Sequence, residues 1–204
     1  QGFIQNLCRE TGRDAADLSE EELDEVYHAT LTLLYRLLFL LYAESRDLLP
    51  VRETRGYWEV SLKKMKQEVA EHAGNLLDET EGRIEQAYDS TETDLYERLK
   101  MLFEVVDEGK RALNVPTYNG GLFVTDPEAR DTDTEAKAAR FLAENTIPDQ
   151  CLALGLDRMA RDLDEKTQGL VFIDYKSLDV DQLGSIYEGL LEFKVRVAED
   201  DLAV

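Results

Sequence analysis

The stretch LYRLLFLLY, residues 34–42, is apolar on nearly every side when it is drawn as a helix. It lies inside a longer segment, residues 20–46, whose apolar side chains recur at helical spacing: Leu23, Val26, Tyr27, Leu31, Leu34, Leu37, Leu38, Leu41 and Tyr42. Ser19 and Glu22, at the start of this segment, have the form of a capping box. Because a helix that is apolar all round is buried on several sides, we expect a long central helix over residues 20–46.

A membrane-spanning helix is the alternative interpretation of this segment. A span needs about 20 predominantly apolar residues. The run at residues 34–42 has only nine positions, and Arg36 interrupts it. A buried core helix is therefore the preferred interpretation.

The charge of the chain limits the partners that it can bind directly. The 204 residues include 44 Asp and Glu against 23 Lys and Arg, so the net charge is −21. A surface of this kind repels phosphate backbones and lacks the clustered cations that drive nucleic-acid binding. The acidic residues are spread along the chain, which is typical of a solvated surface and compatible with a halophilic, cytoplasmic source.

Helical patterns also dominate the rest of the chain. We expect amphipathic helices at residues 61–77 and 93–108, a short helix around Phe141, and helices at 149–163 and 180–193. Residues 78–92 are expected to be a charged connection, and Gly109 a helix C-cap. One strand is predicted at residues 170–175, and residues 193–197 are a candidate second strand. The fold class is thus mainly α: an irregular multi-helix bundle with a long buried central helix and one or two short strands near the C-terminus.

The organisation into domains follows from the length. A chain of 204 residues suits one domain, so residues 1–204 are taken as a single unit. The chain begins at Gln1 rather than Met, and we expect it to be a piece of a longer protein.

Several residues raise functional questions that the pattern answers only in part. Tyr57 and Trp58 are expected to fold back onto the core, the alternative being exposed rings that stack on a nucleic-acid base. Cys8 and Cys151 stand alone and are read as buried free thiols. The two histidines, at positions 28 and 72, have no second His or Cys at ligand spacing, so no metal site is predicted around them.

The segment YNGGLF is the most distinctive turn sequence in the chain. Asn119, Gly120 and Gly121 favour a tight backbone turn, and Tyr118 and Phe123 on either side are suited to burial. A phosphate-binding loop would need a strand before it and a helix start after it, and neither pattern is present. We therefore interpret this segment as a packing turn that docks this helical unit against a neighbour, with Tyr118 and Phe123 as its anchors.

The strongest catalytic candidate has the form PD…DxK. Asp149 follows Pro148, and Asp174 and Lys176 follow the predicted strand. Two carboxylates and a lysine at the end of a strand can hold Mg²⁺ and orient a water for phosphodiester hydrolysis. The structural alternative makes Asp149 the N-cap of a helix and the other two exposed residues at a strand end.

Four stretches in order resemble a known family. They are LLYRLLFLLYAESRDLLP, LFEVVDEGKRALNVPTYNGGLF, IPDQCLALGL and IDYKSLDVDQLGSIYEGLLEF. Together they resemble the helical region upstream of the methyltransferase domain in type IIG fused restriction-modification enzymes and in related phage-defence adenine-specific DNA methyltransferases. The resemblance covers most of the chain, from about residue 25 to residue 193.

The resemblance implies a non-catalytic connector that links a nuclease and a methyltransferase part. S-adenosylmethionine would belong to the parent enzyme, as would Mg²⁺ where a nuclease domain is present, because the family's glycine-rich cofactor loop and Asn-Pro-Pro-Tyr motif are absent here. The flanking domains would be the partners, and DNA would be contacted through the parent. Gly184 and Gly189 are expected to allow close approach of a neighbouring element, with Tyr187 and Glu188 facing the next domain.

Two alternatives to the connector remain open at this point. One is a Mg²⁺-dependent nuclease fragment that uses the PD…DxK residues. The other is a free-standing acidic helical adaptor that binds a partner protein.

Overall fold

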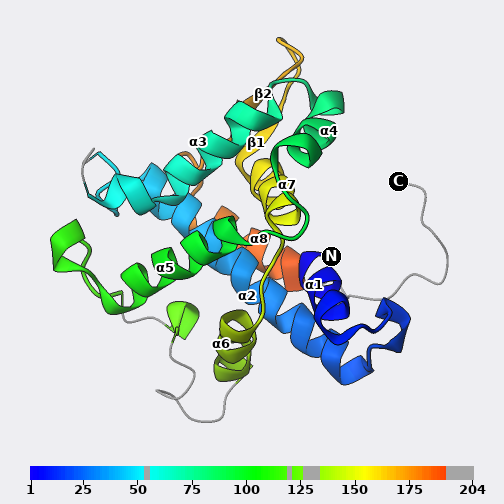
Figure 1. The fold of residues 1–204 in the computed structure, drawn as a ribbon. Helices are drawn as coiled ribbons and strands as arrows, with labels where there is room; N and C mark the ends of the chain where they lie inside the picture. Colours follow the sequence, from blue (N-terminus) through cyan, green and yellow to red (C-terminus); the bar gives the residue numbers. More distant parts are fainter. Residues whose placement is uncertain (53–55, 119–120, 126–133, 192–204) are drawn as a thin grey trace.

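The structure is a computed structural model that describes residues 1–52, 56–118, 121–125 and 134–191. It confirms the predicted class, because helices make up most of the described chain and the two short strands lie near its C-terminal end. The long helix α2 (Glu20–Ser45) crosses the middle of the molecule, and the other elements pack around it (Figure 1).

Helix α2 forms and is buried for the reasons that its sequence indicates. The Ser19 hydroxyl accepts a hydrogen bond from the backbone N–H of Glu22, and the Glu22 carboxylate accepts one from the N–H of Ser19, which confirms the capping box. An 18-residue window of α2 has a mean hydropathy of 1.3 and is long and apolar enough to cross a membrane, and 56% of that window is buried inside the chain.

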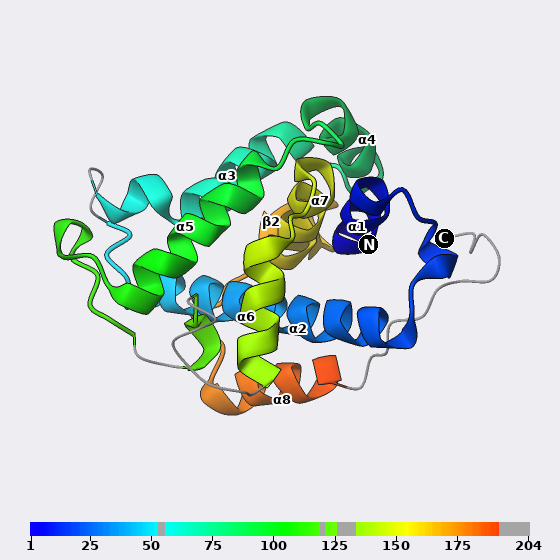
Figure 2. The same ribbon diagram turned by 60° about the horizontal axis from the view of Figure 1, so that its bottom comes forward.

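The remaining large helices lie on different sides of α2. Figure 2 shows α3 (Leu62–Ala73) and α5 (Asp94–Glu108) running side by side on one side, with α8 (Val180–Leu191) on the opposite side. Helix α6 (Thr134–Glu144) crosses α2, and α7 (Asp149–Ala160) packs against both α3 and α5. The core is therefore shared by α2, α3, α5 and α7.

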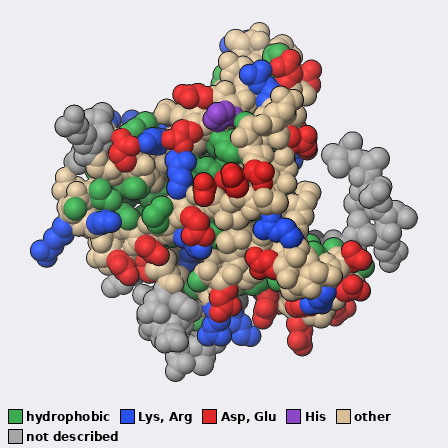
Figure 3. Space-filling view, in the orientation of Figure 1, with side chains coloured by type: hydrophobic (Ala, Val, Ile, Leu, Met, Phe, Trp, Pro, Cys, Tyr) green, Lys and Arg blue, Asp and Glu red, His purple; other side chains and the backbone are tan. Residues whose placement is uncertain are grey.

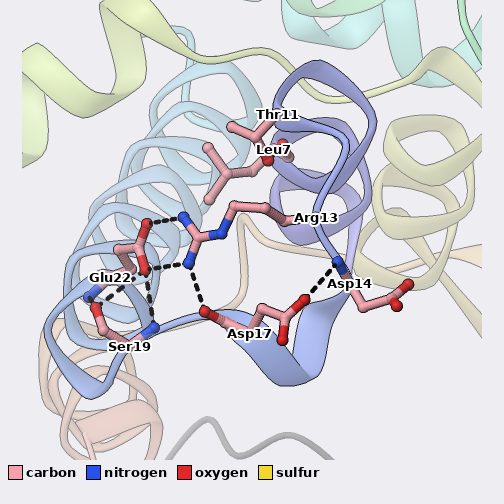
Figure 4. A network of polar contacts seen from close by, with 7 residues as sticks. All are labelled: Leu7, Thr11, Arg13, Asp14, Asp17, Ser19 and Glu22. Atoms are coloured by element: carbon pink, nitrogen blue, oxygen red, sulfur yellow. Dashed lines mark hydrogen bonds and ion pairs between the residues drawn. The ribbon is translucent and has the colours of Figure 1, made fainter.

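The N-terminal helix α1 (Gly2–Thr11) is joined to α2 by a polar network. The Arg13 guanidinium donates to both carboxylate oxygens of Glu22, at 2.7 and 3.0 Å, and to the carbonyl of Asp17 at 2.5 Å (Figure 4). The hydrogen bonding of Glu22 with the Arg13 side chain, together with that from Ser19, lowers the pKa of Glu22 to about 2. The network fixes the direction in which the chain enters α2.

Two elements differ from the sequence-based expectation. The predicted charged connection contains helix α4 (Leu77–Ala87), whose buried side chains Thr80 and Ile84 lie four residues apart and so face the same way. This helix packs on α3 and α7, and its apolar stripe is too narrow to stand out from the surrounding carboxylates. The connection was therefore predicted wrongly, because tertiary contact rather than periodicity stabilises this helix.

The second difference concerns the end of α7. The predicted helix 149–163 stops at Ala160, and the strand β1 (Arg161–Asp164) pairs antiparallel with β2 (Gly169–Phe172). Arg161 is buried and binds Asp157 and the carbonyl of Gly74, which holds the chain in the extended conformation. The candidate second strand at residues 193–197 lies outside the described residues.

The surface carries acidic side chains over most of the face seen in Figure 3. They are scattered among tan and green atoms rather than gathered in one patch, as their spread along the sequence indicates. Scattered carboxylates favour solubility over recognition of one cationic partner.

Candidate functional site

The PD…DxK residues are not brought together. Asp149 is the first residue of α7, whereas the N–H of Ile173, next to Asp174, donates to the carbonyl of Ala160 at the other end of that helix. A helix of 12 residues with a rise of 1.5 Å per residue is about 17 Å long. Carboxylates that share a metal ion must lie within a few ångströms of it, so this geometry contradicts the nuclease interpretation.

Asp149 has a different structural role. Its carboxylate accepts a hydrogen bond of 2.8 Å from the backbone N–H of Leu95, in the first turn of α5. Its own N–H donates to the carbonyl of Glu92 at 2.7 Å. The side chain therefore caps α5 instead of α7, whose N-cap position is Pro148, so the predicted cap was assigned to the wrong helix.

The carboxylates around Asp149 are the group with metal-ligand spacing in the described part of the chain. Oxygens of Glu92, Asp94 and Asp149 lie within 4.8 Å of one another. Burial raises the pKa of Asp149, and the negative charges of Asp94 and Glu92 raise it further. Because one Asp149 oxygen accepts a hydrogen bond from the α5 backbone, the Asp149 carboxylate acts in the fold as a helix cap.

Asp174 and Lys176 line a different cavity, of about 230 Å³, together with Glu44 from the last turn of α2. Glu44 is only 3% exposed. Its carboxylate accepts hydrogen bonds from the Tyr57 hydroxyl at 2.8 Å, the Leu62 N–H at 2.9 Å and the Lys63 N–H at 2.6 Å. Glu44 thus joins the end of α2 to the first turn of α3.

Burial and hydrogen bonding shift the pKa of Glu44 in opposite directions. Burial raises the pKa of Glu44 to about 7, and the three hydrogen bonds together with the charge of Lys66 counteract only part of that effect. A buried carboxyl with such a pKa changes charge near neutral pH. The sequence motif AESR gives no sign of this, because Tyr57 is separated from Glu44 by a loop.

Arg36, inside the apolar run of α2, is 3% exposed and fixes the YNGGLF turn. Its guanidinium donates to the carbonyl of Leu122 at 2.7 Å and to that of Val124 at 2.8 Å. It also lies 5.0 Å from the ring centroid of Phe103 and 5.9 Å from that of Phe123. Burial lowers the pKa of Arg36 to about 10, which leaves it charged at neutral pH.

The anchors of the turn point into this chain. Phe123 is 2% exposed and packs edge-to-face on Phe39 and Phe103. The Tyr118 hydroxyl donates to the carbonyl of Leu48 at 2.8 Å. These contacts show that the turn at Gly121–Phe123 packs on α2 and α5 of this chain, whereas its expected docking against a neighbour stays a prediction. Asn119 and Gly120 lie outside the described residues.

The α8 residues are arranged differently from the expectation. Tyr187 does not face outward: its ring lies 4.5 Å from that of Tyr35, and each hydroxyl donates to the other residue's carbonyl. No atom lies within 4 Å of a Cβ built at Gly184 or Gly189, so neither allows close approach of another described element. Glu188 is exposed, and its expected contact with a next domain stays a prediction.

The aromatic pair and the cysteines also have structural positions. Tyr57 is fully buried and Trp58 half-buried, which confirms that the pair folds back onto the core. Cys8 and Cys151 are free, but both are partly exposed instead of buried. Cys151 lines a cavity of about 470 Å³ between α1, α2, α4 and α7. The lining of that cavity mixes apolar side chains with polar ones, which include Gln150 and Arg158.

Comparison of the chain with protein-family models, with curated proteins and with solved structures finds no match.

Proposed function

We propose that this chain is a non-catalytic helical connector of a DNA restriction-modification or phage-defence adenine-N6 methyltransferase. The observation that carries the proposal is the separation of Asp149 from Asp174 and Lys176 at opposite ends of α7. The PD…DxK residues therefore do not form a shared site for phosphodiester chemistry. The charged side chains of Arg36, Glu44 and Asp149 bind backbone groups of remote segments, which is a scaffolding role.

The contacts between the resembling stretches support the same proposal. The first stretch meets the second where Arg36 binds the carbonyl of Leu122, and it meets the fourth where Tyr35 packs on Tyr187. Arg46, also in the first stretch, donates to the carbonyl of Leu178 in the fourth at 2.7 Å. The family-like residues thus serve the internal packing of a helical unit and do not converge on a reaction centre.

In this proposal the chemistry belongs to the flanking parts of a longer chain. S-adenosylmethionine is bound by the methyltransferase part and Mg²⁺ by a nuclease part, and both parts dock on the connector in the cytoplasm. The exposed apolar side chains of Ile186 and Leu191 on α8, at 38% and 59% exposure, are suited to such docking. The acidic surface leaves DNA to the flanking parts.

The first test is the reading frame in the source genome. The proposal predicts that the frame continues beyond residue 204 into a glycine-rich cofactor loop and an Asn-Pro-Pro-Tyr motif. The protein from that frame should transfer methyl groups from S-adenosylmethionine to DNA adenine. A frame that closes near residue 204 would remove the proposal's main support.

The second test is made on the complete protein. Ile186→Glu should lower adenine methylation by weakening docking, whereas Asp174→Asn should leave it unchanged. Methylation that is lost with Asp174→Asn while the melting temperature is unchanged would contradict a purely structural role of this chain.

A further inference from the structure

The cavity that contains Glu44 gathers three lysine side chains in an acidic protein. It lies between the end of α2, the first turn of α3 and the segment after β2, and it is lined by Leu41, Glu44, Ser45, Lys63, Lys66, Asp174 and Lys176. Lys63 and Lys66 are three residues apart on α3 and so project from one side of that helix. In a chain with a net charge of −21, this cavity has the opposite charge character from its surroundings.

None of the three ammonium groups forms an ion pair with a residue that the structure describes. Lys63, Lys66 and Lys176 form neither an ion pair within 4.0 Å nor a side-chain hydrogen bond there. Lys64, which faces away from the cavity, shows the contrast: its ammonium group lies 2.6 Å from Glu59. Two carboxylates, those of Glu44 and Asp174, also line the cavity, but neither forms an ion pair within 4.0 Å with a cavity lysine.

The contacts that the cavity lysines do make leave their charge in place. The ammonium group of Lys63 lies 5.9 Å from the ring centroid of Trp58, and that of Lys66 lies 4.9 Å from that of Phe172. Such contacts attract a cation to the face of the ring without neutralising it.

The nearby carboxylates are already engaged. Glu44 accepts its three hydrogen bonds from Tyr57 and the backbone of α3, and Asp174 accepts one from the N–H of Lys176 at 3.1 Å. Asp47 forms an ion pair with Arg52. The pKa of Asp47 is lowered first by that contact, and the charges of Lys176 and Lys63 lower it further. The cavity lining thus combines three lysines with two carboxylates that are already hydrogen-bonded within the chain.

We propose that this cavity binds a phosphate group. Lysine ammonium groups are phosphate ligands that act as point charges, and here three lysines from two separate segments line one cavity. The volume of about 230 Å³ is several times the roughly 30 Å³ that one water occupies in the liquid, so a five-atom oxyanion fits with solvent around it. The phosphate belongs either to a free phosphate or nucleotide or to a DNA backbone, and the site does not depend on the connector function.

The test measures binding of three probes to the whole chain in a low-chloride buffer: inorganic phosphate, deoxyadenosine monophosphate and a 12-base-pair DNA duplex. Titration calorimetry should detect one site. Lys66→Gln and Lys176→Gln should each weaken binding at least fivefold. Lys64→Gln is the matched control, because it removes a neighbouring lysine outside the cavity, and it should change binding by less than twofold.

The outcomes separate the sources of the phosphate and the ways in which the proposal fails. Binding of the two small probes without the duplex identifies a free ligand, and binding of the duplex that is weakened by Lys176→Gln identifies a DNA backbone. Lys176 is exposed, so its replacement should not unfold the chain, and equal melting temperatures check this. No binding of any probe, or equal weakening by Lys64→Gln, overturns the proposal.

Discussion

Glu44 should make the stability of the protein depend on pH in a direction opposite to that of most carboxylates. Its pKa is raised from 4.5 to about 7 because burial penalises the charged form. A carboxyl with a raised folded pKa stabilises the fold fully below the unfolded pKa, and that contribution is lost as the pH rises through the folded value. The stabilising contribution of Glu44 is therefore expected to be lost between about pH 4.5 and pH 7.

The magnitude follows from the size of the shift. A difference of about 2.5 pKa units at 1.36 kcal/mol per unit corresponds to about 3 kcal/mol. Since Glu44 is 3% exposed, solvent screens little of this energy. Its replacement by glutamine keeps the shape and removes the titration, so the unfolding free energy of the wild type relative to Glu44→Gln should fall by about 3 kcal/mol across the window.

The assay is urea unfolding of both proteins at half-unit steps from pH 4 to 8. The difference between the two proteins isolates Glu44 from the other titrating groups. Glu22→Gln, measured against the wild type from pH 2 to 5, is the control of opposite sign, because the pKa of Glu22 is lowered to about 2 and its contribution is lost as the pH falls from 4.5 towards 2. A difference between wild type and Glu44→Gln that stays flat from pH 4.5 to 7 would refute the reasoning.

Variants at three further positions test the internal scaffold by urea unfolding at pH 7. Arg36→Met should lower the unfolding free energy by about 3 kcal/mol, because it leaves the carbonyls of Leu122 and Val124 without their donor. Arg36→Lys should not restore that stability, because lysine lacks the planar fork of the guanidinium. Wild-type stability of Arg36→Lys would contradict this role of Arg36. Asp149→Ala should cost about 1 kcal/mol through loss of the α5 cap, and an unchanged midpoint would exclude that role. Gly109→Ala should lower the unfolding free energy by about 1–3 kcal/mol, since Gly109 has a φ of +74° and a Cβ there would lie 2.6 Å from a backbone nitrogen. Wild-type stability of this variant would show that the turn relaxes around the added Cβ.

The elements that sequence predicts well are those whose signal is local. The apolar run around residues 34–42 and the Ser19–Glu22 pair are each complete within a few residues, and α2 follows them closely. Helix α4 and strand β1 were missed because their stabilising contacts come from elsewhere. Ile84 is buried by neighbouring helices, and Arg161 is held by the carbonyl of Gly74.

The candidate site shows the same limit more strongly. Asp149 caps a helix whose first turn lies 54 residues earlier in the sequence, and no pattern at Asp149 indicates this partner. Arg36 did carry a usable signal, because a charged residue inside a helix that is buried all round must find polar partners. Its partners are backbone carbonyls, which have no sequence signature.

The most direct test of the central claim, that this chain performs no catalysis of its own, is a plasmid-nicking assay. The purified chain and its Asp174→Ala variant are incubated with supercoiled plasmid and Mg²⁺, and the topological forms are separated on a gel. The plasmid should stay supercoiled with both proteins. Nicking by the wild-type chain that disappears with Asp174→Ala would contradict it.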